Sequence, residues 1–337
     1  MGDVTHVNNN MTSKIFASTI WFVIGAASIF VTSTDMAYAQ SYPAKPVRMV
    51  APYAPGGSSS AAAIVLSQRF QDLTGQALVI DYKPGAGSNI GSDLVAKSPP
   101  DGYVVLMGTS SLAINPSLYR RMSFDPLRDL TPVALLFSAA NVLAVNPTLP
   151  IKSVQELIDF ARANPGKLNY GSSGNGATNH MAMELLKHMA QIDIVHVAYK
   201  GSSLIVPALM ANEVQVTFSP ASSLQAIDKA GRVRMIAVSG TKPVPDLPLP
   251  TIASSGLPGF RSEVWFGLFA PAGTPPAVVS KLNADINNVL KDRQMLDVLE
   301  KQGMQAGGGT SDDMRKLLLE DHARWAGVIK ATGIKAD

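Results

Sequence analysis

The feature that most constrains this chain is a local pattern that repeats along it. A short apolar run is followed by a turn rich in glycine and serine, and then by a helix with apolar periodicity; the turns lie at residues 55–60, 84–89 and 171–178. Strand–loop–helix alternation of this kind places strands in parallel, with right-handed crossovers. The pattern therefore predicts an α/β fold with mostly parallel sheets.

The expected elements fall into two groups along the chain. Apolar runs predict strands, and apolar periodicity between glycine and proline breakers predicts helices. We expect strands at residues 47–52, 77–82, 103–107, 168–170, 194–197, 214–218, 234–238 and 265–270, and helices at 61–73, 89–97, 153–164, 177–189, 276–290, near 295 and at 311–332. No long linker separates the groups, so we expect two α/β lobes joined by crossing strands.

The first 39 residues have the features of a secretory signal peptide. Lys14 precedes an apolar stretch at 15–31, and a more polar patch leads to Ala37-Tyr38-Ala39. A basic start, an apolar middle and an A-x-A end predict cleavage after Ala39. The alternative is an uncleaved anchor, although an apolar stretch of this length is at the short edge for spanning a bilayer. We therefore expect an exported protein that works in the periplasm.

Composition excludes several kinds of function. The chain has no cysteine, which rules out disulfides, zinc–thiolate sites and cysteine nucleophiles. The formal net charge is only +3, and no basic run is interleaved with aromatic residues. We therefore expect no nucleic-acid partner.

Two glycine-rich motifs suggest enzymes only superficially. Residues 85–91 read GAGSNIG, which has GxGxxxG spacing instead of the GxGxxG dinucleotide fingerprint, and no acidic residue ends the next strand near Met107. Residues 171–175 read GSSGN, which lacks the second glycine of the GxSxG nucleophile elbow. We therefore expect no cofactor and predict that the protein is not an enzyme.

His180, Glu184 and His188 are spaced four residues apart and share one helical stripe. A metal site needs histidine and carboxylate groups that converge from several elements, or an HExxH motif, and neither is visible. We expect a polar helix face, from which His180 alone could reach the mouth of the turn at 171–178.

The three glycine- and serine-rich turns form the candidate binding site. Each places backbone N–H groups at a helix N-terminus, where the helix dipole favours negative charge. In an open parallel sheet such turns lie at the carboxyl ends of the strands, where ligands bind. Any one glycine could simply let the chain bend, but three such turns drawn from two lobes predict a site for a small anion.

A lysine and a cluster of aromatic residues are two further candidates for this site. Lys200 lies between a strand and a helix, so it is a candidate cation near the cleft, with a solvated surface lysine as the alternative. Trp265, Phe266 and Phe269 sit in an apolar run, and we expect them in the core.

Several stretches of the chain carry a resemblance to a known family. They read YPAKPVR at 42–48, APGG at 54–57, KPGAGSNIG at 83–91, PDGY at 100–103, YGSSG at 170–174, YKG at 199–201, WFGLFAPAGTP at 265–275 and ATGIK at 331–335. Because these stretches occur in this order and at this spacing, the chain resembles the substrate-binding proteins of the tripartite tricarboxylate transporters, the Bug family.

The resemblance implies a type II-like periplasmic binding fold whose lobes comprise residues 40–141 plus 263–337 and residues 142–262. It also implies a carboxylate held in the cleft by backbone amides, hydroxyls and bridging waters. The ligand-binding residues carried over are Tyr53, Gly56, Gly57, Ser58, Gly87, Asn89, Thr109, Ser110, Ser172, Ser173, Thr178, Tyr199, Lys200 and Gly201.

The chain departs from the family pattern in a few places. Ser60 and Ile64 replace the usual Asp and Arg of the first turn, and Leu204 and Ser219 replace a usual Pro and Asp. The loss of two carboxylates near the cleft would favour a more anionic or more apolar ligand.

Together these features predict a monomeric, non-enzymatic receptor that captures a small carboxylate and delivers it to membrane transporter subunits. A ligand receptor for a sensor kinase is the alternative, because both roles need the same closure of two lobes around a ligand.

Overall fold

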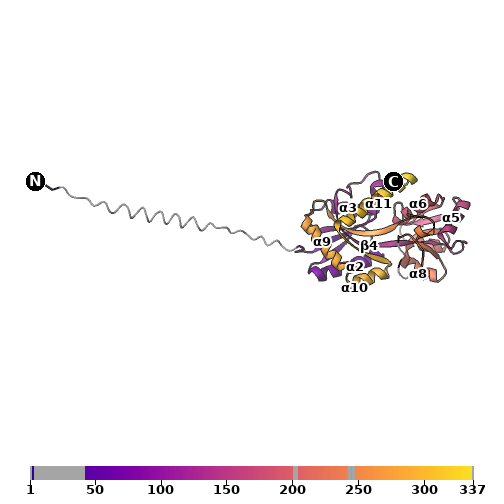
Figure 1. Ribbon diagram of the computed structural model, residues 1–337, viewed down its shortest axis with the longest axis horizontal. Helices are drawn as coiled ribbons and strands as arrows, with labels where there is room; N and C mark the ends of the chain where they lie inside the picture. Colours follow the sequence, from indigo (N-terminus) through magenta and orange to yellow (C-terminus); the bar gives the residue numbers. More distant parts are fainter. Residues whose placement is uncertain (1, 4–41, 200–203, 242–243, 245–246, 336–337) are drawn as a thin grey trace. The chain divides into compact units, whose positions relative to one another are not determined.

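One long strand, β4 (Leu130–Val145), belongs to two sheets in the computed structural model of the protein (Figure 1). Up to Ala140 it pairs with strands of the first sheet, and from Asn141 onward it pairs with strands of the second. β4 is therefore a covalent connection between the two halves of the fold.

The structure describes residues 2–3, 42–199, 204–241, 244 and 247–335, without the side chains of Gly57 and Ser58. The predicted leader at 1–39 therefore lies outside the described residues, except for Gly2 and Asp3. Residues 42–337 form one compact unit, and the description below concerns that unit.

The first sheet combines parallel and antiparallel pairs. Its strands follow the spatial order β2 (Leu78–Tyr82), β1 (Val47–Ala51), β3 (Val104–Thr109), β9 (Glu263–Pro271) and β4, with β10 (Met304–Gly308) also paired to β4. The first three strands are mutually parallel, as the strand–turn–helix pattern predicts, whereas β9 is antiparallel to both of its neighbours.

The second sheet repeats this arrangement. It contains β4, β7 (Val216–Pro220), β5 (Asn169–Ser172) and β6 (Val195–Ala198), with β8 (Arg234–Val238) also paired to β4. β5 is parallel to β6 and β7, and β4 is antiparallel to β7 and β8.

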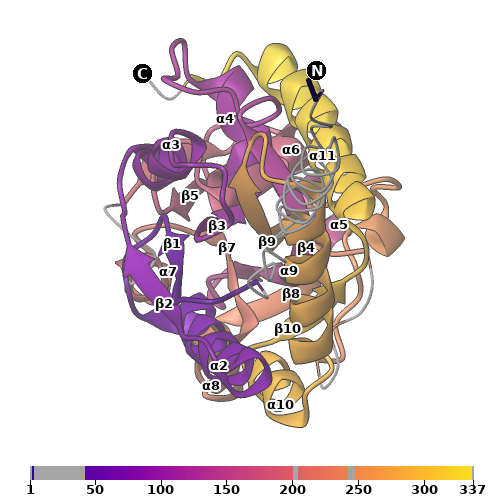
Figure 2. The same cartoon turned by 90° about the vertical axis from the view of Figure 1, so that its left-hand side faces the viewer.

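Helices pack on the faces of both sheets (Figures 1 and 2). In chain order they are α2 (Gly57–Thr74), the 3₁₀ turn η1 (Ala86–Ser88), α3 (Asn89–Ala96), α4 (Ser111–Leu118), α5 (Val154–Ala163), α6 (Thr178–Ala190), α7 (Ile205–Met210), α8 (Ala221–Lys229), η3 (Ala253–Ser255), α9 (Pro276–Val289), α10 (Arg293–Lys301) and α11 (Ser311–Thr332). α2 packs against α9 and α10, and α11 packs against α4, α6 and β4.

Successive side chains along a strand point alternately to the two faces of the sheet, and each face has its own hydrophobic core. On β9, Phe269 points into a core that α3, α4 and α11 share with α5 and α6, whereas Leu268 points into a core beneath α2, α9 and α10. Successive side chains of a strand face opposite sides of the sheet, so each central strand serves both cores. Burying one such leucine or phenylalanine contributes roughly 2 kcal/mol.

The α/β fold predicted from the sequence is confirmed, and most expected elements lie within a few residues of their predicted bounds. The elements that were not predicted include β4, α4 and β10, and no bounds were predicted for α7 and α8. Among the described residues, no helix combines the length and apolar character needed to span a bilayer.

Candidate functional site

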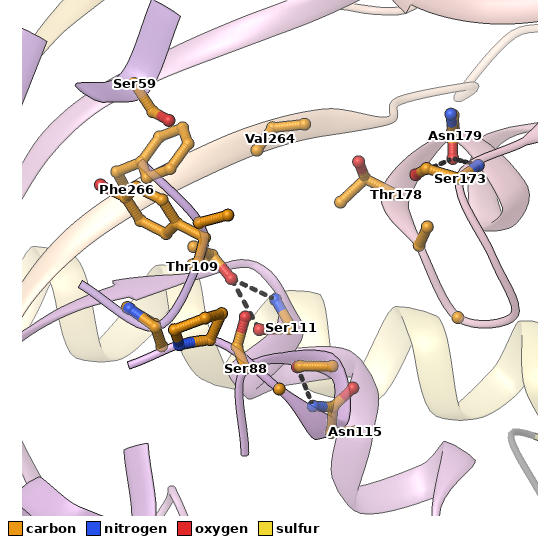
Figure 3. Close-up of a pocket in the computed structure, with 18 of the residues that line it drawn as sticks. Ser59, Ser88, Thr109, Ser111, Asn115, Ser173, Thr178, Asn179, Val264 and Phe266 are labelled. Carbon is orange, nitrogen blue, oxygen red and sulfur yellow. Dashed lines mark hydrogen bonds between the residues drawn. The ribbon is translucent and has the colours of Figure 1, made fainter. Parts of the chain in front are cut away.

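A cavity of about 650 Å³ lies where strand ends from both sheets meet (Figure 3). The first sheet and its helices contribute Pro52, Tyr53, Ala54, Ser59, Pro84, Gly85, Gly87, Ser88, Thr109, Ser111, Asn115, Tyr119, Val264 and Phe266. The second sheet contributes Asn141, Ser173, Asn175, Gly176, Ala177, Thr178, Asn179 and Pro220.

Some of the predicted site residues line this cavity. They are Tyr53, Gly87, Thr109, Ser173 and Thr178. They come from three strand-ending loops of the first sheet and from one loop of the second, so the glycine- and serine-rich turns do converge on one space.

Other predicted residues lie beside the cavity or away from it. Asn89, Ser110 and Ser172 do not line the cavity, although each is next to a lining residue in the sequence. Gly56 is the N-cap of α2, with Gly57 and Ser58 in its first turn. Tyr199 donates its hydroxyl to Glu213 Oε2 at 3.4 Å and does not line the cavity. Lys200 and Gly201 fall outside the described residues.

The turn after β2 is fixed by an amide from another helix. Asn115 on α4 donates Nδ2 to the main-chain oxygen of Gly87 and to Asn89 Oδ1, each at 2.8 Å. Gly87 has a φ of 60°, and a Cβ there would lie 2.7 Å from the Tyr119 hydroxyl. Only glycine therefore fits this close approach to the cavity wall.

The end of β3 presents a hydroxyl pair to the cavity. Thr109 Oγ1 and Ser111 Oγ lie 2.6 Å apart, and the Ser111 amide donates to Thr109 Oγ1 at 3.3 Å. Between them, the Ser110 amide donates to the main-chain oxygen of Trp265 at 3.1 Å, which ties this loop to β9.

The loop after β5 forms the opposite wall. Asn179 Oδ1 accepts hydrogen bonds from the amide and the hydroxyl of Ser173, at 3.3 and 3.2 Å. Further along the loop, the Gly176 amide donates to His180 Nδ1 at 3.0 Å. Figure 3 shows Ser173, Thr178 and Asn179 across the cavity from Ser59 and Thr109.

Asn141 lies where β4 passes from one sheet to the other. Its main-chain N–H donates to Ser239 Oγ at 2.9 Å, and its main-chain carbonyl accepts from the main-chain N–H of Ser239 at 2.8 Å. The side chain is 5% exposed and lines the cavity, but Nδ2 has no hydrogen-bond partner within the described part of the chain. A buried donor without a partner is costly, so Asn141 Nδ2 is a candidate hydrogen-bond donor to a ligand.

The described part of the cavity wall carries hydrogen-bonding groups but no charged side chain. None of the described lining residues is Asp, Glu, Lys, Arg or His.

The helices that begin at or beside lining residues, α2, α3, α4, α6 and α8, have no side-chain cap. By contrast, Ser153, Asp292 and Thr310 cap α5, α10 and α11, which begin elsewhere. α9, which begins after Pro275, is also uncapped.

One side of the cavity is apolar. Tyr53 and Phe266 pack edge to face with their ring centroids 5.9 Å apart, beside Val264. The Tyr53 hydroxyl is directed to Met107 Sδ at 3.0 Å, and burial raises its pKa above the usual value. Phe266, which we expected only in the core, is buried and lines the cavity as well.

The substituted family positions do not line the cavity. Ser60 and Ser219 are buried, whereas Ile64 and Leu204 are exposed. Among the described residues, no group of three or more histidine, aspartate and glutamate side chains is arranged to hold a metal ion.

Sequence reasoning missed several lining residues, above all Asn141, Ser111, Asn115 and Asn179. Asn141 did leave a signal, since it is a lone amide inside the apolar run at 133–145. Asn115 and Asn179 lie inside helices, where spacing alone does not show which face meets the cavity.

The fold and the cavity are those of a two-lobed α/β binding protein. The sequence model described as "Tripartite tricarboxylate transporter family receptor" matches residues 62–334. The chain belongs to this family, and it is therefore a solute-binding receptor of a tripartite tricarboxylate transporter. Receptors of this family are periplasmic solute-binding proteins, not enzymes.

Individual relatives agree with this assignment. Protein BugT of Bordetella pertussis is 33% identical over 319 residues, which cover 93% of this chain and 98% of BugT. An R. palustris protein solved with adipate has a TM-score of 0.77 and 36% identity, and the match covers 87% of this chain and 99% of that one. MatC from Rhodopseudomonas palustris, solved with bound malate, has a TM-score of 0.74 and 27% identity, with 86% and 100% covered.

Proposed function

We propose that this receptor captures a small carboxylate in the cavity between its two sheets and passes it to the membrane subunits of its transporter. The buried Nδ2 of Asn141, which lines the cavity without a partner, carries this proposal. A carboxylate oxygen there would accept its hydrogen bond and remove the desolvation penalty of the free donor.

Neutral groups hold the anion in this proposal. The uncapped N-termini of α2, α3 and α6 supply backbone N–H groups and positive dipole ends. Hydroxyls of Ser59, Thr109 and Thr178 add further donors. Because none of the described lining residues is a cation, these residues bind through directed hydrogen bonds, which select the position of each carboxylate oxygen.

The apolar side of the cavity indicates the body of the ligand. Tyr53, Val264 and Phe266 offer carbon surface to a hydrocarbon segment, and hydroxyl groups on that segment would be buried there without partners. Adipate has such a segment, and the related R. palustris protein was solved with it. We therefore assign this cavity to carboxylates with an apolar body.

The lobes, the cellular location and the absence of catalysis are parts of the same proposal. Lobe 1 comprises residues 40–141 plus 263–337 and lobe 2 comprises 142–262, which is supported by the change of β4 partners at Asn141. In this proposal residues 1–39 direct export and are then removed. The mature protein acts in the periplasm as a monomer. The lining residues that are described include no aspartate, glutamate, histidine or lysine, and in this proposal the ligand leaves unchanged.

The test is calorimetric titration of the protein with adipate, malate, citrate, benzoate and a neutral diamide, on wild type, Asn141→Asp and a control, Asn288→Asp. Asn288 is exposed on α9, away from the cavity. We expect wild type and the control to bind a carboxylate and Asn141→Asp to bind it at least tenfold more weakly, because the new carboxylate repels the ligand. Binding of the diamide alone, or unchanged affinity in Asn141→Asp, would refute the proposal.

A further inference from the structure

His180 lies behind the cavity wall, outside the set of lining residues. Its side chain is 4% exposed in the first turn of α6. Nδ1 accepts a hydrogen bond from the amide of Gly176, which does line the cavity, at 3.0 Å. The imidazole is therefore one residue layer away from the proposed ligand.

A column of rings supports this imidazole. His196 on β6 stacks on His180 with the centroids 4.2 Å apart and the planes 26° apart, and Tyr170 on β5 stacks on His196 at 4.7 Å. His196 Nε2 lies 2.6 Å from Ser172 Oγ, at the start of the same loop. The column thus holds both ends of the segment at 172–176.

Charged groups lock the far side of the column. Tyr170 donates its hydroxyl to Glu184 Oε1 at 2.6 Å, and Lys187 donates Nζ to the same oxygen at 2.7 Å. His196, Glu184 and Lys187 are the ionisable groups that act on His180, and the Tyr170 ring lies parallel to it with the centroids 6.3 Å apart. Oε1 of Glu184 is thus hydrogen-bonded to both Tyr170 and Lys187.

We infer that His180, as a neutral imidazole, is a positioning residue that holds the loop at 173–178 in the conformation that receives the ligand. The inference rests on the proposed function, since it concerns the same cavity. His180 touches the loop backbone and not the ligand, so its effect on affinity is transmitted through Gly176.

The direction of the hydrogen bond fixes the tautomer. Nδ1 accepts from an N–H group only while it carries no proton, so the ring must hold its proton on Nε2. Protonation of Nδ1 would make its N–H point at the main-chain N–H of Gly176, and the two donors would repel each other. It would also place a cation over the face of His196. Burial, followed by the neighbouring His196, lowers the pKa of His180 to about 4, so the acceptor form persists at neutral pH.

The variants separate an acceptor role from simple packing. His180→Asn keeps an acceptor, Oδ1, close to the position of Nδ1, whereas His180→Leu fills the space without one. His188→Leu is the matched control, because His188 is exposed on the same helix. The probe is adipate, followed by malate where adipate does not bind.

By calorimetry at pH 7.5, we expect His180→Leu to bind about five- to tenfold more weakly than wild type. We expect His180→Asn and His188→Leu to stay within about twofold. Between pH 7 and 3.5, wild type should lose more affinity than His180→Asn, because protonation of the ligand is common to both proteins and only wild type also loses its acceptor as the pH falls through about 4.

Two outcomes overturn the inference alone. One is wild-type affinity in His180→Leu, and the other is equal weakening in His180→Asn and His180→Leu when both variants unfold cooperatively. Nitrogen NMR of the wild-type ring needs no variant and decides the point if His180→Leu fails to fold, because a proton on Nδ1 at pH 7.5 contradicts the inference. Failure of wild type to bind any carboxylate would refute the proposed function first, and the positioning role with it.

Discussion

The side-chain amide of Asn115 donates to the main-chain oxygen of Gly87 at 2.8 Å and so joins helix α4 to the turn that follows β2. The same nitrogen also reaches Asn89 Oδ1 at the start of α3. Asn115 is 2% exposed, and it brings two loops of the first sheet together at the cavity.

Replacing Asn115 with Ala should therefore affect stability and binding together. The Gly87 oxygen and Asn89 would lose their partner, and we expect the free energy of unfolding to fall by about 1–2 kcal/mol. Adipate affinity should fall about tenfold as the turn loosens. Urea denaturation and calorimetry measure the two effects, with Asn288→Ala as the exposed control. Unchanged affinity in a destabilised Asn115→Ala would show that the turn does not contact the ligand.

Gly176 and Gly327 give opposite expectations for the same substitution. Gly176 has a φ of 75°, and a Cβ there would overlap Leu118 Cδ2 on α4, which lies directly against the loop. Gly176→Ala should cost about 1–3 kcal/mol of stability and weaken adipate binding, since both strain and overlap push the loop away from α4.

Gly327 is exposed within α11, and a Cβ there would meet no atom within 4 Å. Gly327→Ala should therefore raise the free energy of unfolding by about 0.5–1 kcal/mol, because alanine loses less backbone entropy in a helix. Thermal unfolding of both variants tests the pair, and a stabilised Gly176→Ala would contradict the overlap.

Asp321 holds α11 to the start of β9. Its Oδ1 accepts from Arg261 and Arg324 at 2.8 and 2.7 Å, and its Oδ2 accepts from Trp265 Nε1 at 2.7 Å. Asp321→Asn removes the charge and leaves two guanidinium groups facing a neutral amide. We expect a loss of about 3 kcal/mol in urea denaturation. Asp312→Asn, exposed at the beginning of the same helix, should change stability by less than about 0.5 kcal/mol.

Stability should fall in mild acid because of the buried histidines. The pKa of His180 drops from 6.5 to about 4 on folding, so the unfolded chain binds more protons between these values. Stability is then greatest above pH 6.5 and declines as the pH falls toward 4, by up to about 3 kcal/mol. Burial also lowers the pKa of His196, which acts in the same direction.

Denaturant unfolding at several pH values from 7.5 to 4.5 measures this dependence. The slope should be shallower in His180→Asn, which has no titrating group at this position. Equal slopes in the two proteins would mean that His180 does not change its proton affinity on folding.

The sequence was enough to predict most strands and helices, because apolar runs and glycine or proline breakers are local signals. The turn after β2 shows this well, since glycine at 85 and 87 marked it and Gly87 does line the cavity. The role of each lining residue toward a ligand stays a prediction.

Strand β4 contains an apolar run at 133–145, but no local signal in this run shows that one strand continues from the first sheet into the second. Its function as a shared strand depends on partners far away in the sequence, such as Phe218 opposite Leu143 and Leu268 opposite Ala134. Spacing along one strand does not specify which strand lies beside it.

The sequence by itself determined the α/β fold, the family and the turns at the carboxyl ends of the strands. Only the tertiary structure decided that Asn141 lies unpaired at the cavity and that His180 holds Gly176 from behind. The physical reason is that periodicity reports which residues are apolar, whereas a binding site is made by polar groups from distant segments that packing of the cores brings together.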